Sequence, residues 1–182
     1  MRKLRYERMG IPRKYWNLKP LVFIKKRKIL KTVWSRLLES LQAPNNRGAI
    51  LESDKDELRS TFGAAILKYM TARHLINGRW LYLPDVIHKI TSTKFNDLAW
   101  AEFRDDILKK DRIVVIDNFD VRRINNSDDI INGLYDFFYK LFNNSEAKVL
   151  ILTPNPIHVF ESTLDQQLTA LLDKNINLWS KV

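Results

Sequence analysis

The stretch IVVIDN at residues 113–118 decides which fold this chain can adopt. Its first four residues are apolar and β-branched, which is typical of a strand buried on both faces, since neither face then meets water. A second apolar run, VLIL at 149–152, ends three residues before Asn155. Such strands occur in parallel sheets covered by helices, and these sheets bind ligands just beyond the carboxyl ends of their strands. Asp117, Asn118 and Asn155 are therefore candidate site residues.

Helical and strand patterns alternate along the rest of the chain. Apolar residues recur with helical spacing at 28–41, 62–74, 98–109, 128–142 and 164–172. Further short apolar runs, typical of strands, lie at 49–51, 80–83 and 176–179. Alternation of this kind predicts strands joined by right-handed crossovers. We therefore expect an α/β fold, a doubly wound sheet of about five parallel strands with helices on both faces.

Composition excludes several classes of protein. The chain has 182 residues, about one domain, and its 45% apolar content is enough to bury a core. The absence of Cys excludes disulfide frameworks, iron–sulfur clusters, thiol catalysis and Cys-type zinc sites. The three histidines have no metal-ligand spacing, so we expect no metal site. No apolar run approaches the roughly 20 residues of a membrane helix, so we expect a cytoplasmic protein without a membrane partner.

Positive charge is concentrated in the first quarter of the chain. Residues 1–50 contain 14 Lys/Arg and two Asp/Glu, whereas residues 51–182 have a net charge of −2. This asymmetry predicts a polyanionic partner, most simply DNA bound without sequence preference. Gly10 and Pro12 predict an arm without helices at 1–27, ahead of one domain at 28–182. The candidate nucleic-acid contacts are Arg13, Lys14, Trp16, Lys25, Lys26, Arg27 and Lys28.

The order of these segments resembles the DnaC-like helicase loaders and the IstB-type ATP-binding proteins, a branch of the AAA+ ATPases. The segment 10–16 resembles the lead-in to the family's ATPase domain, and 48–51 resembles its first strand. The segment 60–67 resembles the helix after the phosphate-binding loop. Residues 113–117 are similar to Walker B, and 149–155 to the strand that ends in the sensor Asn. The resemblance implies a P-loop fold and, for an active member, ATP and Mg²⁺ as cofactors.

The phosphate-binding loop departs from the pattern of that family. A P-loop reads G-x-x-x-x-G-K-[ST], because glycines let backbone N–H groups surround the phosphates and the lysine reaches the β- and γ-phosphates. The matching segment, SDKDELRS at 53–60, has no glycine, Arg59 replaces the lysine, and only Ser60 is retained. Three acids stand in the same loop: Asp54, Asp56 and Glu57. Each would repel a phosphate charge about 4 Å away by roughly 1–4 kcal/mol.

The same loop has a structural interpretation as the start of a helix. Ser53 followed by Asp56, or Asp54 followed by Glu57, is a capping-box pattern. Acids in a first helical turn also interact favourably with the helix dipole. We therefore predict that this helix begins near Asp54 and not near Arg59, so that side chains occupy the place of the phosphates.

Other parts that an ATPase of this family needs are also altered. The family usually has a second acid after the Walker B Asp, and here Asn118 stands there, which cannot act as a general base. The late helix that carries the family's sensor or finger arginine reads DQQLTAL at 165–171, without Arg. We therefore expect no catalytic residue and no cofactor, that is, a pseudo-ATPase.

Three functional interpretations remain. The first is a non-hydrolysing adaptor that binds DNA and a partner protein, either a replicative helicase or another AAA+ subunit, with self-association as a further possibility. The second is an active but atypical helicase loader that uses Arg59 and Asp117 with ATP and Mg²⁺. The third is a simple DNA-binding protein or an inhibitor of a host loader. Nucleotide binding separates the second interpretation from the other two.

Overall fold

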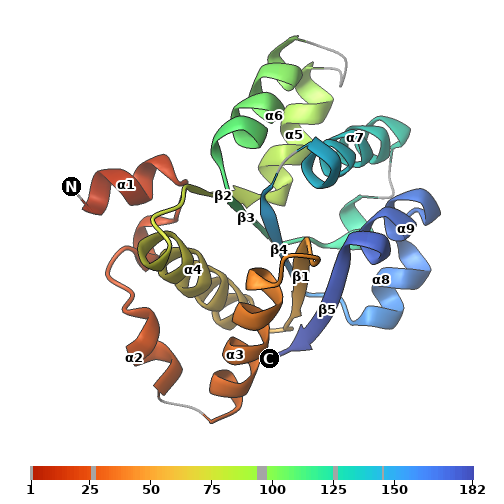
Figure 1. Ribbon diagram of the computed structural model, residues 1–182. Helices are drawn as coiled ribbons and strands as arrows, with labels where there is room; N and C mark the ends of the chain where they lie inside the picture. The colour runs from red at the N-terminus through yellow and green to blue at the C-terminus, as the bar shows by residue number, and fades with distance from the viewer. Residues whose placement is uncertain (1, 26–27, 94–97, 125–126, 145) are drawn as a thin grey trace.

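The computed structural model describes residues 2–25, 28–93, 98–124, 127–144 and 146–182 (Figure 1). Among them, five strands form one sheet in the order β2-β3-β4-β1-β5, and each neighbouring pair is parallel. The strands are β1 (Gly48–Glu52), β2 (Gly78–Tyr82), β3 (Ile113–Asp117), β4 (Lys148–Thr153) and β5 (Ile176–Lys181). The five predicted strands and the doubly wound α/β fold are thus confirmed.

Helices cover both faces of the sheet (Figure 1). One face carries α1 (Arg2–Arg8), α2 (Pro20–Lys25), α3 (Lys28–Gln42) and α4 (Asp56–Arg73). The other carries α5 (Leu83–Thr93), α6 (Leu98–Lys110), α7 (Asp128–Asn144), α8 (Ile157–Thr163) and α9 (Gln166–Asn175). The core is accordingly divided by the sheet: Ile50 packs on the side of α5–α9, whereas its neighbours Ala49 and Leu51 pack on the side of α1–α4.

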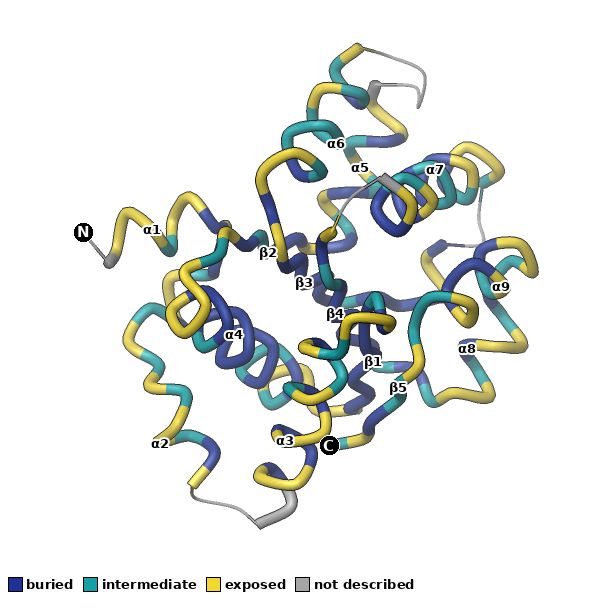
Figure 2. The backbone as a smooth tube through the Cα atoms, in the orientation of Figure 1, coloured by how far each residue is buried: buried dark blue, intermediate teal, exposed yellow. Residues whose placement is uncertain are grey.

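The apolar composition of the central strands follows from the two layers of helices that cover the sheet. All five residues of β1 and all five of β3 are buried, because both faces of the central strands lie under helices. Figure 2 shows these strands and most of α4 in dark blue. From Phe62 to Thr71, helix α4 is buried on almost all sides, since it lies between the sheet and the helices α2 and α3.

The N-terminal region differs from the helix-free arm that Gly10 and Pro12 predict. Helix α1 ends before Gly10, and α2 begins at Pro20, where the missing N–H of proline costs nothing because a first-turn N–H has no helical partner. Met9, Ile11, Tyr15 and Ile24 are buried in the same cluster as α3 and α4: Met9 is 5% exposed and Ile11 3%. Residues 9–24 therefore contribute side chains to the core of their own chain.

Two contacts hold this N-terminal segment in place. The Trp80 N–H of β2 donates to the Met9 carbonyl at 2.7 Å. The buried ammonium of Lys68 on α4 donates to the carbonyls of Tyr15, Trp16 and Leu18 at 3.1, 2.9 and 2.7 Å. The segment is thus fixed against both the edge strand and the longest helix on its face.

Candidate functional site

A cleft of about 590 Å³ opens at the carboxyl ends of β2 and β3. The N-terminal segment from Gly10 to Tyr15 forms one wall, and the first turn of α4 forms another. Asp117 at the end of β3 lines this cleft, together with Trp80 and Tyr82 of β2. This is the position at which an open parallel sheet binds a ligand.

The first turn of α4 begins at Asp56, with Lys55 as its N-cap residue. Among the described residues, positive φ angles occur at Gly10, Leu75 and Asn118 and not within 53–58. The helix begins two residues after Asp54 and three before Arg59, so the prediction of a start near Asp54 and not near Arg59 is confirmed. The predicted capping box is wrong, because Lys55 makes no side-chain cap and the Ser53 hydroxyl instead accepts a hydrogen bond from the Lys55 N–H at 3.2 Å.

The side chain of Arg59, at the position of the P-loop lysine, contacts residues of its own loop. Its side chain is 1% exposed, and its guanidinium donates to the Ser53 carbonyl at 2.5 Å and to Asp56 Oδ1 at 2.6 Å. Ser53 is fully buried, and its backbone N–H donates to the Thr153 carbonyl of β4. The cation is thus neutralised within the loop, and it fixes the loop to the sheet.

Ser60 and Asp117 form the second contact of the cleft. The Ser60 hydroxyl donates to Asp117 Oδ2 at 2.8 Å, and the Asn118 N–H donates to Asp117 Oδ1 at 2.9 Å. Burial raises the pKa of Asp117, and the hydrogen bond from Ser60 and the charge of Arg59 offset only part of this increase. The two residues that would bind Mg²⁺ in an active relative are therefore bonded to each other.

Asn118 and Asn155 have different positions relative to the cleft. Asn118 lies in the cleft with φ +59° and donates from Nδ2 to the Tyr82 hydroxyl at 3.1 Å. Asn155 is 3% exposed, and its Oδ1 accepts the Val121 N–H at 2.9 Å. The side chain of Asn155 therefore shapes the loop after β3 and stays outside the cleft lining.

The cleft has no surplus of positive charge. Its described lining has the cations Lys14 and Arg59 against the carboxylates Asp56, Asp85 and Asp117. Lys14 also approaches the exposed Glu57 at 3.8 Å. The exposed Asp54 adds a further negative charge to the same loop. Neither the free lysine nor the glycine-lined loop that a triphosphate requires is present, so the lining does not fit a Mg²⁺–nucleotide.

The predicted nucleic-acid residues are scattered over the N-terminal region. Trp16 is half-buried, donates from Nε1 to the Ile11 carbonyl at 2.7 Å and lies under Arg13, so the ring packs on its own segment. Lys25 is exposed at the end of α2. Lys26 and Arg27 lie outside the described residues, and for Lys28 only its place at the start of α3 is described.

Most exposed cations of this region lack an acidic partner. In the described part of the chain, the following N-terminal side chains are exposed and make no ion pair: Lys3, Arg8, Arg13, Lys19, Lys25, Lys31 and Arg36. Cations farther along the chain are commonly paired, as Arg104 is with Asp136 at 2.5 Å and Arg112 with Glu146 at 2.7 Å. Exposed cations without an ion pair are therefore most numerous between Lys3 and Arg36, on one side of the sheet.

The sequence interpretation missed the residues that build the N-terminal wall of the cleft. Lys68 is the clearest example, and its signal was a single charge within the apolar run FGAAILKYM at 62–70. A lysine in such a run must be buried with partners, because an isolated buried charge is too costly. Its three carbonyl partners come from a segment 50–53 residues away in the sequence, so the pattern did not identify them.

The described residues contain no group of three or more His, Cys, Asp or Glu that could hold a metal ion. None of the described helices is long and apolar enough to cross a membrane.

No protein-family model matches the sequence, and no curated protein matches it either. Solved structures do match. Domain III of the Thermotoga maritima replication initiation protein DnaA has a TM-score of 0.67 and 17% identity, covering 94% of this chain and 68% of that one. The DnaC helicase loader has a TM-score of 0.68 and 14% identity, covering 92% of this chain and 98% of that one. AMPPCP-bound DnaA from Aquifex aeolicus has a TM-score of 0.70 and 12% identity, covering 94% of this chain and only 51% of that one.

These likenesses establish the fold. The chain has the fold of the DnaC helicase loader and of domain III of the replication initiation protein DnaA, as its resemblance to the helicase loaders predicts. At identities of 12–17% the likeness does not extend to activity.

Proposed function

We propose that this chain is a non-hydrolysing AAA+-like adaptor in DNA replication or in the maintenance of a mobile element. It binds DNA through its basic N-terminal region and binds a partner protein, a replicative helicase or another AAA+ subunit. The strongest support is the conformation of Arg59, whose guanidinium is bonded to Ser53 and Asp56 within the loop that would otherwise hold phosphates.

Nucleotide binding would require this arrangement to be taken apart. Withdrawing Arg59 leaves the buried Ser53 carbonyl without a partner, at a cost of about 1–3 kcal/mol. A triphosphate would then lie beside Asp56, and a like-charge pair of this kind costs roughly 4 kcal/mol at an intermediate dielectric. These costs cancel the gain that an ordinary phosphate loop provides.

Titration with labelled ATP and Mg²⁺ tests the absence of nucleotide binding. We expect no binding at micromolar concentrations. The retained contact between Ser60 and Asp117 favours one alternative, an atypical ATPase with its magnesium ligands in place. Micromolar binding that is lost in Asp117→Asn would support this alternative and contradict the adaptor proposal.

The unpaired cations of α2 and α3 support the DNA-binding part of the proposal. Replacing both Lys25 and Lys31 with Ala should weaken binding to any DNA sequence and lower the salt slope by up to about 2, since each neutralised phosphate contributes about 0.9. The matched control replaces Lys109 and Lys174, two exposed lysines on the far side of the sheet, and should leave both affinity and slope unchanged. Equal losses in the two double variants would place the DNA contact elsewhere.

The buried N-terminal segment supports association through surfaces other than an extended arm. Since residues 9–24 pack on the chain's own core, a partner must recognise the folded domain. Light scattering of the protein alone, and then of a mixture with the replicative helicase of its host, measures this directly. A strict monomer that forms no complex with helicase or another AAA+ protein would favour a simple DNA-binding protein.

A further inference from the structure

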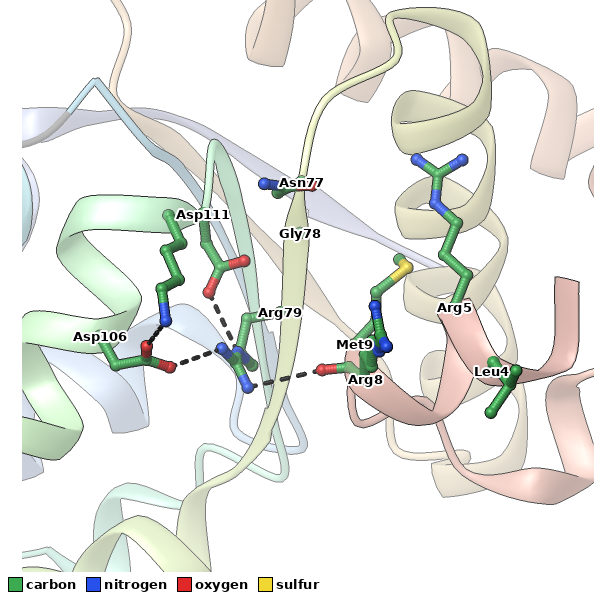
Figure 3. Close-up of a pocket in the computed structure, with 10 residues that line it drawn as sticks. Leu4, Arg5, Arg8, Met9, Asn77, Gly78, Arg79, Asp106 and Asp111 are labelled. Carbon is green, nitrogen blue, oxygen red and sulfur yellow. Dashed lines mark hydrogen bonds and ion pairs between the residues drawn. The ribbon is translucent and has the colours of Figure 1, made fainter. Parts of the chain in front are cut away.

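A second hollow, of about 1020 Å³, lies beside the edge strand β2, between α1 and α6 (Figure 3). It shares no lining residue with the cleft that contains Asp117. Leu4, Arg5 and Arg8 of α1 form one wall, and Arg79, Asp106 and Asp111 form the opposite wall. The functional site therefore does not account for this hollow.

The edge of β2 is only partly paired within the chain. Strand β2 stands at the end of the sheet, and Trp80 donates its N–H to the Met9 carbonyl across the free edge. Gly10 has φ +72°, and its backbone lies against the Trp80 carbonyl. Gly78 lies two residues before Trp80, so its N–H and C=O point to the same side, because backbone groups alternate along a strand.

Gly78 borders the hollow, and within the described residues no hydrogen bond uses its backbone across this edge. An edge N–H and C=O without partners can pair with another extended chain. The hydrogen bond from the Trp80 N–H to the Met9 carbonyl shows that this edge already pairs with a backbone segment at Trp80. The hollow lies where that pairing stops.

The charges around the hollow favour an acidic occupant. Arg79 donates to Asp106 and Asp111 at 3.0 Å each, and Lys110 also pairs with Asp106, so both acids are already neutralised (Figure 3). The exposed Arg8 side chain has no ion pair among the described residues. Arg5 donates to the carbonyls of residues 71 and 76 and retains its positive charge. The walls therefore have a net charge of +2, with four cations against two acids.

We propose that this hollow binds an extended acidic segment of a partner protein, which adds to the edge of β2 beside Met9. Backbone hydrogen bonds to Gly78 hold the segment in register, and its carboxylates face Arg8 and Arg5. Main-chain pairing of this kind provides affinity, and the side chains on either side provide the preference for acidic residues. This site lies between α1 and β2, whereas the lysines chosen above to test DNA binding lie on α2 and α3.

A display library of random seven-residue peptides, selected on the folded protein, tests the proposal. We expect enrichment of peptides rich in Asp and Glu. A synthetic peptide of the enriched sequence should bind at least fivefold more weakly when its central backbone nitrogen is methylated, since methylation removes the donor and leaves the charge. Arg8→Glu should weaken binding at least fivefold, whereas Arg36→Glu, the same change at an exposed residue outside the hollow, should not.

Three results would overturn the proposal. The first is a library that yields no enriched peptide or yields basic ones. The second is equal affinity for the methylated and unmethylated peptides, which would exclude pairing with β2. The third is equal loss in Arg8→Glu and Arg36→Glu. If a single-stranded DNA displaces the peptide and methylation has no effect, the hollow is a general polyanion surface.

Discussion

Gly10→Ala tests how the N-terminal wall of the cleft is held. The residue adopts φ +72°, and an added Cβ would lie 2.8 Å from the backbone oxygen of Trp80. Alanine in the left-handed region costs about 1–2 kcal/mol. The segment must also move off the edge strand, and losing the bond between Trp80 and Met9 costs about 0.5–1.5 kcal/mol more. We therefore expect a loss of about 1.5–3.5 kcal/mol in the free energy of unfolding.

Urea unfolding measures this loss, and limited trypsin digestion reports whether the segment around Arg13 is released first. Gly10→Asn is the matched variant, because asparagine tolerates left-handed backbone but still brings a Cβ towards Trp80. It should fall between wild type and Gly10→Ala. If Gly10→Ala unfolds within 0.5 kcal/mol of wild type and shows unchanged digestion, the described contact does not hold the segment.

Three other substitutions probe the core and the cleft. Burial raises the pKa of Asp117, so its contribution to stability is fully present below the unfolded pKa and is lost as pH rises through the folded pKa. Asp117→Asn should therefore be at least as stable as wild type at pH 7. Urea titrations should show that any extra stability of the variant becomes smaller towards pH 4. Lys68→Met should cost about 1–3 kcal/mol because carbonyls of the N-terminal segment lose their donor, whereas the same change at Lys31, an exposed residue of α3, should stay within about 0.5 kcal/mol. In Gly63→Ala the new Cβ would lie 2.4 Å from the buried Leu152 Cδ1. Overpacking should destabilise the fold by about 1–3 kcal/mol, which exceeds the gain of about 1 kcal/mol in helix propensity. The thermal unfolding midpoint should therefore fall.

Part of the degenerate loop was predictable and part was not. The absence of glycine from 53–60 requires ordinary backbone angles there, which favours an early helix start, and α4 does begin at Asp56. The N-terminal cap of α4 was mispredicted because the backbone of Ser53 continues the pairing of β1, with its N–H bonded to the Thr153 carbonyl. Its carbonyl accepts Arg59, a residue that sequence patterns assign to the ligand and not to the loop itself.

Hydrophobic periodicity is a local property, so the sequence by itself determined the strands, the main helices and their alternation. The runs at 113–116 and 149–152 are buried strands in any parallel sheet, and the +12 charge of residues 1–50 needs no structure to be recognised. The packing of the N-terminal region could not be predicted from the sequence, because its contacts are with residues distant in the chain. Lys68 binds carbonyls more than 49 residues away, and Met9 pairs with Trp80 across the edge of the sheet. No local pattern encodes such contacts, since they depend on which surfaces the folded chain brings together.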